Sequence, residues 1–161
     1  MFQAISLAVI AVLTVIDQLT KYAAVATVKV NGPKEFLFGL FQFRYVENTG
    51  AAFSSFSDNT FVLIVFSGVI LLLALGVLLL HKVKSNFINV CIVLACAGGI
   101  GNMIDRIKLG YVVDFIEPLF IDFAVFNFAD CCITVGAFML LGYEVYEIIR
   151  DYRKKKASEN D

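Results

Sequence analysis

The segment 59–80 reads NTFVLIVFSGVILLLALGVLLL and contains no Lys, Arg, Asp, Glu or His in 22 residues. A helix needs about 20 apolar residues to cross the roughly 30 Å hydrocarbon core of a bilayer. The segment 85–104 adds a second run of 20 uncharged residues. Both runs are long enough to span a membrane, so they indicate an integral membrane protein.

Two less regular apolar segments flank these runs. Residues 1–16 carry no charge, and the apolar pattern resumes after Asp17 and Lys21. Residues 131–143 are uncharged and are continued by an amphipathic stretch to Ile149. We therefore expect an all-α membrane protein with four transmembrane helices in a single membrane-embedded domain (1–161). The expected helices cover residues 3–26, 60–81, 87–106 and 129–149, and a basic tail follows at 150–161.

The composition supports this class. Hydrophobic residues make up 60% of the chain and charged residues 17%, and the mean hydropathy is +0.83. In soluble domains, about 45–50% of the residues are hydrophobic and about 25% are charged. These values exclude a disordered chain, a collagen-like chain and an ordinary soluble globule. The net charge of −1 gives no indication of a nucleic-acid partner.

Basic residues predict the orientation. The loop 81–86 and the tail 150–156 are rich in Lys and Arg, and short basic segments favour the cytoplasm. Four spans then place both termini in the cytoplasm and segments 29–58 and 107–128 on the outer face. Alternating polarity at 41–45, and the aromatic and β-branched residues at 119–126, predict extended chain. We expect a small β-rich platform there, which either holds a substrate chain or is plain loop packing.

The first helix contains an acid and a base. Asp17 and Lys21 stand four residues apart, so on a helix they share a face and can form a structural ion pair. The sequence Ala24-Val25-Ala26 resembles a signal-peptide cleavage site. No basic segment precedes it and charges interrupt the apolar run, so we expect the helix to be retained.

The third helix ends in AGGIGNMIDR, residues 97–106. Asn102, Asp105 and Arg106 lie on one helical face. Ala97 and Gly101 form a small-xxx-small step that permits close helix packing. A structural polar latch between helices would explain this pattern, although ionisable residues inside membranes are also functional candidates.

Two aspartates lie near the outer surface, at the ends of one connecting segment. Asp114 follows two valines in YVVDF, and Asp130 follows FNFA at the start of the fourth helix. Asp130 is also typical of a residue that caps a helix. Two carboxyls close together in a low dielectric acquire different proton affinities, so one ionises while the other stays protonated. This pattern favours aspartic-protease chemistry.

Other catalytic chemistries lack the residues that they need. The four cysteines, at 91, 96, 131 and 132, fit neither C-x-x-C nor a zinc site, and we expect them to pack as small hydrophobes. His81 is the single histidine and lies at the end of the second helix. We predict neither a metal nor another cofactor.

Five sequence blocks, in order across the four spans, resemble the lipoprotein signal peptidase family, the type II signal peptidases of bacteria. They are DQLTK at 17–21, ENTGAAF at 47–53, GGIGNMIDR at 98–106, VVDF at 112–115 and FNFAD at 126–130. The resemblance covers nearly the whole chain.

The resemblance implies a specific activity in the bacterial cell membrane. The family removes the signal peptide of prolipoproteins on the amino side of a diacylglyceryl-cysteine and is inhibited by globomycin. Its catalytic aspartates match Asp114 and Asp130. Polar active-site positions match Asn48, Asn102, Arg106 and Asn127, and supporting positions match Asp17, Lys21, Gly50, Gly101 and Asp105. Cys131 stands where the family commonly has serine, which puts in doubt a hydrogen bond from this position.

We hypothesise that one aspartate activates water and that the other, protonated, stabilises the oxyanion. The expected partners are the prolipoprotein and membrane lipid, and we expect a monomer. Arg106 could pair with Asp105, with the aspartate pair or with a lipid phosphate. We expect the segment 50–58 to gate the site. The alternative is a non-catalytic four-helix scaffold or a small transporter subunit.

Overall fold

The computed structural model describes residues 2–50 and 60–158 of the chain. Four helices account for most of them: α1 (Phe2–Asn31), α2 (Thr60–Leu79), α3 (Asn86–Leu109) and α4 (Phe128–Ser158). Each is long and apolar enough to cross a membrane. The expected mostly helical class is therefore confirmed.

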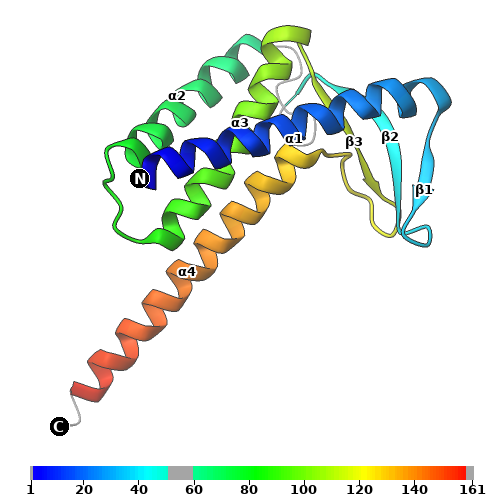
Figure 1. Cartoon of the computed structure of the whole chain (residues 1–161). Helices are drawn as coiled ribbons and strands as arrows, with labels where there is room; N and C mark the ends of the chain where they lie inside the picture. Colours follow the sequence, from blue (N-terminus) through cyan, green and yellow to red (C-terminus); the bar gives the residue numbers. More distant parts are fainter. Residues whose placement is uncertain (1, 51–59, 159–161) are drawn as a thin grey trace.

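Helix α3 lies at the centre of the bundle and packs against the other three helices (Figure 1). Glycines on α3 permit this close approach. A Cβ at Gly98 would collide with the backbone carbonyl of Ala129 in α4, and a Cβ at Gly101 would collide with the carboxylate of Asp17 in α1. The most buried apolar side chains of the bundle include Leu78 and Cys96.

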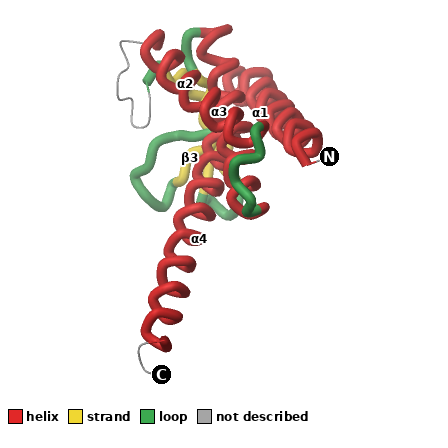
Figure 2. The backbone as a smooth tube through the Cα atoms, turned by 90° about the vertical axis from the view of Figure 1, so that its left-hand side faces the viewer, coloured by secondary structure: helices red, strands yellow, loops and turns green. Residues whose placement is uncertain are grey.

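Two helices are longer than the apolar runs alone suggest. Helix α1 continues to Asn31, and α4 continues through the basic segment to Ser158. In α4 the added residues include Lys, Arg and Glu, which are good helix formers, so this helix does not end where hydrophobicity ends. The C-terminal part of α4 extends away from the bundle by itself in both Figure 1 and Figure 2.

A three-stranded antiparallel sheet joins the ends of α1 and α3. Its order is β1 (Lys34–Phe36), β2 (Phe41–Asn48) and β3 (Val112–Pro118). Phe36 pairs with Phe41 in the first ladder, and Val46 pairs with Asp114 in the second. The register shifts between Phe43 and Val46. The alternating segment 41–45 is thus a strand, as expected.

The segment 119–126, expected to be extended, does not form a strand of the sheet. Strand β3 ends at Pro118, and of the following residues only Phe126 forms a bridge, to Ile116. Leu119 donates its backbone N–H to Leu40, and several later aromatic and apolar residues line a cavity. Their composition therefore reflects contact with a cavity and not a place in the sheet. The predicted gate, apart from Gly50, lies outside the described residues.

Candidate active site

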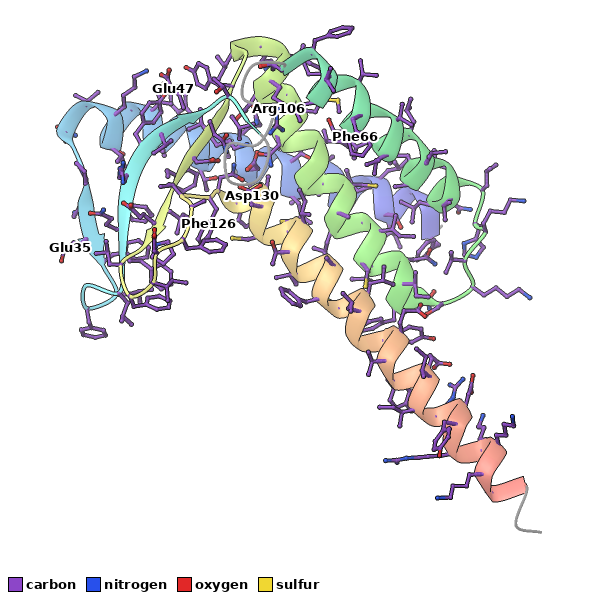
Figure 3. All side chains as sticks on the ribbon, turned by 180° about the vertical axis from the view of Figure 1, so that it is seen from behind. Glu35, Glu47, Phe66, Arg106, Phe126 and Asp130 are labelled. Atoms are coloured by element: carbon purple, nitrogen blue, oxygen red, sulfur yellow. The ribbon has the colours of Figure 1, made fainter. Side chains whose placement is uncertain are left out.

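Asp114 and Asp130 come from different elements and line one cavity of about 540 Å³. Asp114 lies on β3, and Asp130 lies in the first turn of α4. Figure 3 shows Asp130 and Arg106 on the side of the bundle that adjoins the sheet. The remaining lining residues are Asn48, Asn102, Val112, Phe123, Ala124, Val125, Phe126, Cys131, Ile133, Thr134 and Val135.

Two amides hold the carboxylate of Asp114. Asn48 Nδ2 donates to Oδ2 at 2.8 Å, and Asn127 Nδ2 donates to Oδ1 at 2.6 Å. The residue is 1% exposed. Burial raises the pKa of Asp114 to about 6, and the negative charge of Asp130 adds to the shift, while the two amide donors oppose it. Asp114 therefore changes its protonation state much closer to neutral pH than an exposed aspartate does.

Asp130 has two roles at the start of α4. Its Oδ2 accepts from the backbone N–H of Asn127 at 3.2 Å, and Asn127 Oδ1 accepts from the backbone N–H of Asp130 at 3.0 Å. This reciprocal pattern is a capping box, so the expected capping role is present. The second oxygen, Oδ1, accepts from Asn102 Nδ2 at 2.7 Å. Capping thus uses only Oδ2 of the carboxylate and leaves Oδ1 for the contact with Asn102.

Asn102 and Asn127 connect the two aspartates. Asn127 Nδ2 donates to Asn102 Oδ1 at 3.1 Å as well as to Asp114. The result is a continuous chain of hydrogen bonds from Asp114 through two amides to Asp130. Because Asn127 is 0% exposed and Asn102 is 7% exposed, buried contacts fix both amides in position.

A buried charge cluster lies beneath this chain. Lys21 Nζ lies 3.0 Å from Asp17 Oδ2, 3.0 Å from Asp105 Oδ2 and 2.8 Å from Asn102 Oδ1. The Asp17–Lys21 pair expected from the sequence is present, and Asp105 joins it from α3. Asp17 and Asp105 also accept backbone N–H groups of Ala129 and Val113, each at 3.0 Å. The cluster thereby connects α1, α3, α4 and β3.

Arg106 lines the cavity and directly contacts no carboxylate of the described residues. Among the described residues it forms no ion pair, and its Nη2 donates to the backbone carbonyl of Gly50 at 3.0 Å. Its Nε is buried and finds no acceptor in the part of the chain that the structure describes. Gly50 in turn donates its N–H to Asn48 Oδ1 at 3.0 Å. Of the pairings that the sequence left open for Arg106, neither carboxylate option is formed.

Some neighbours of the site were not predicted from the sequence. Gln18 Nε2 donates to Asp105 Oδ1 at 2.9 Å and to the carbonyl of Gly101 at 3.2 Å. Gln18 follows Asp17 directly and stands three residues before Lys21, and this position in the sequence could have indicated that it lies near the site. Cys131 lines the cavity, whereas Cys132 packs in the interior. Among the described residues, no group of three His, Cys, Asp or Glu side chains could hold a metal ion.

The chain is similar to known proteins over most of its length. Residues 9–146 match the family model of signal peptidase II. The lipoprotein signal peptidase of Streptococcus thermophilus is 38% identical over 138 residues, which cover 86% of this chain and 90% of that protein. The lipoprotein signal peptidase of Streptococcus pyogenes serotype M1 is 37% identical over 129 residues, which cover 80% of this chain and 85% of that protein. One solved bacterial membrane enzyme superposes with a TM-score of 0.83 at 28% identity, and the match covers 90% of this chain and 90% of the enzyme. A second superposes with a TM-score of 0.76 at 30% identity, and the match covers 86% of this chain and 90% of the enzyme. The chain belongs to the signal peptidase II family.

Proposed function

We propose that Asp114 and Asp130 are the catalytic dyad of an intramembrane aspartic endopeptidase. Membership of the signal peptidase II family makes the protein a peptidase of lipoprotein signal peptides. The observation that carries the proposal is that the two carboxyls line one cavity and are joined by two buried amides. The substrate is a prolipoprotein, cleaved on the amino side of its diacylglyceryl-cysteine.

The reaction proceeds by direct attack of water. The ionised carboxylate takes a proton from a water molecule while the water oxygen attacks the scissile carbonyl carbon. The protonated carboxyl donates a hydrogen bond to the carbonyl oxygen, on which negative charge develops. Collapse of the tetrahedral intermediate breaks the C–N bond, and the amine of the lipidated cysteine leaves with a proton. No covalent enzyme intermediate forms.

The surrounding polar groups keep the dyad ready for this reaction. Asn48 and Asn127 orient Asp114, and Asn102 orients Asp130, so little reorganisation is needed at the transition state. Arg106 supplies a cation in the same cavity. Its buried Nε has no acceptor among residues 2–50 and 60–158, and we assign it to a carbonyl of the substrate backbone, which would otherwise be desolvated without a partner.

The apolar part of the cavity suits a lipidated substrate. Phe123, Val125, Phe126, Ile133 and Val135 form its wall. A signal sequence is an apolar helix, and its cysteine carries acyl chains that stay in lipid. Because one chain supplies the whole described lining, we propose that the protein works as a monomer.

The test replaces each aspartate by asparagine, which keeps size and removes the ionisable group. Asp114→Asn and Asp130→Asn should each lower kcat for a diacylglyceryl-modified precursor by about 10²–10⁴-fold, the usual range for general acid–base groups. Cleavage is measured in proteoliposomes, and thermal unfolding of each variant is measured alongside it. Asp122→Asn is the control, because Asp122 is an exposed carboxylate on the same outer connection.

Full activity in either dyad variant would refute the proposal. If instead both variants failed to assemble in the membrane, the two carboxyls would be structural, as the scaffold alternative holds. The family assignment does not favour that alternative. A folded variant with normal unfolding and lost cleavage supports the dyad.

A further inference from the structure

The turn between β1 and β2 exposes large apolar side chains. Phe38 is 104% exposed, Leu37 is 55% exposed and Leu40 is 50% exposed. Leu40 donates its backbone N–H to Leu37 at 3.1 Å, which closes the turn. Turns that face water usually carry Gly, Asn, Asp or Ser, so this turn has the composition of a buried segment in an exposed position.

The backbone of this turn makes its composition more unusual. Leu37 has φ of 50° and Phe38 has φ of 58°. The left-handed region is unfavourable for a residue with a Cβ, and Gly or Asn would occupy it at lower cost. The chain thus holds two large, exposed apolar residues in an unfavourable backbone conformation. A favourable contact outside the protein would offset that cost.

The segment after β3 enlarges the apolar surface. Leu119 donates its backbone N–H to Leu40 at 2.8 Å, and the ring of Phe120 meets Phe41 edge-on with centroids 5.5 Å apart. Leu119, Phe120 and Ile121 are 42%, 58% and 51% exposed. We call these residues and the turn the sheet tip; it comprises Leu37, Phe38, Leu40, Leu119, Phe120 and Ile121. Contiguous exposed patches of this kind mark sites of protein or membrane contact.

The sheet behind the tip has one polar face. Glu35, Gln42 and Glu117 are register partners across the three strands, and paired residues point to the same side of a sheet. Gln42 donates to Glu117, and Arg44 Nη1 lies 2.7 Å from Glu117 Oε1. This face is suited to water.

The opposite face carries aromatic rings. Phe36 stacks on Phe43 with centroids 4.2 Å apart and on Phe41 with centroids 5.7 Å apart. Phe43 and Phe115 then border a groove of about 240 Å³ along α1. Phe43 and Phe115 pack in one cluster with Ala24, Val25 and Val28 of α1, so this part of the sheet is held against the helix and the tip beyond it stays exposed.

The position of the sheet decides what its apolar side contacts. In Figure 1 the strands run back from the ends of α1 and α3 along the flank of the bundle, and the β1–β2 turn does not reach beyond the end of α1. Helix α1 exposes Leu19, Tyr22 and Val30, which are 61%, 74% and 74% exposed. The sheet thus lies beside α1, a helix long and apolar enough to cross a membrane.

We propose that the sheet tip is a lipid-docking surface that inserts into the acyl-chain region of the outer leaflet. Burial in lipid removes the cost of exposing six large apolar side chains to water. It also anchors β3, which carries Asp114, at a fixed depth in the bilayer. This proposal goes beyond peptide cleavage and does not depend on the catalytic role of either aspartate.

The absence of tryptophan from the sequence permits a direct test. Phe38→Trp places a single tryptophan at the tip, and Glu35→Trp places one on the polar face of the neighbouring strand as the matched control. Each variant is reconstituted into phosphatidylcholine vesicles with or without bromine on the acyl chains. We expect brominated lipid to quench most of the emission at position 38 and little at position 35. Acrylamide, a quencher dissolved in water, should quench the emission at position 35 more strongly than the emission at position 38.

Two outcomes would overturn the proposal. Quenching at position 38 by acrylamide and not by brominated lipid would place the tip in water. Protection from both quenchers would place it against protein, as in self-association. Phe120→Trp provides a second probe of the same surface if the first variant does not fold, and it must follow the result expected at position 38.

Discussion

The protonation of Asp114 is set by opposing effects on a single side chain. Burial raises its pKa to about 6, and hydrogen bonds from Asn48 and Asn127 act in the opposite direction because they stabilise the carboxylate. Removing one donor should therefore raise the pKa further. In Asn48→Ala we expect the limb of the kcat/KM profile that titrates Asp114 to move to higher pH.

The kcat/KM profile is the appropriate measurement because it reports groups of the free protein. Gln42→Ala is the matched control, since Gln42 lies on the same strand and bonds to Glu117 on the polar face. Its profile should coincide with that of the parent protein. A limb that stays in place, or that moves to lower pH, in Asn48→Ala would contradict this account of Asp114.

Several of these residues could be predicted from the sequence, and others could not. The Asp17–Lys21 pair follows from helical spacing, which is local. Asp105 also joins Lys21, but that contact depends on how α1 packs against α3. The capping role of Asp130 was recognisable from its place at a helix start, whereas its link to Asn102 required the fold.

At the scale of elements, glycines on α3 determine how closely the helices pack. Gly101→Ala should destabilise the protein by about 1–3 kcal/mol, the usual cost of overpacking, because the new methyl group would collide with the Asp17 carboxylate. It should also lower activity, since Asp17 holds the start of α4 through Ala129. Thermal unfolding in detergent and cleavage in proteoliposomes measure the two effects.

The control for this substitution is Gly76→Ala in α2, where a Cβ meets nothing within 4 Å. Alanine is the better helix former, so this variant should be as stable as the parent or more stable by about 0.5–1 kcal/mol. Equal stability of the two alanine variants would show that the Gly101 contact does not limit packing.

Elements differ in how far the sequence predicted them. The long apolar runs predicted the helices because a membrane imposes length and composition directly on each segment. Strand β2 was visible as an alternation of polarity. The aromatic segment 119–126 was misleading as a candidate strand, because its residues line the cavity and the sheet tip, and of them only Phe126 bridges to the sheet.

For the whole molecule, the basic loop 81–86 and the basic end of α4 predict which side of the membrane each part faces. We propose that both termini are cytoplasmic and that the sheet and the cavity mouth lie on the outer face.

Single cysteines test this topology in a variant whose four native cysteines are replaced by alanine. Lys34→Cys reports the sheet, Lys82→Cys the α2–α3 loop and Ala157→Cys the end of α4, and all three positions are exposed. A maleimide that cannot cross membranes should label position 34 in intact cells and positions 82 and 157 only after the membrane is opened. Labelling of all three in intact cells would contradict a four-span topology, and labelling of 82 and 157 without 34 would reverse the orientation and place the dyad on the cytoplasmic side.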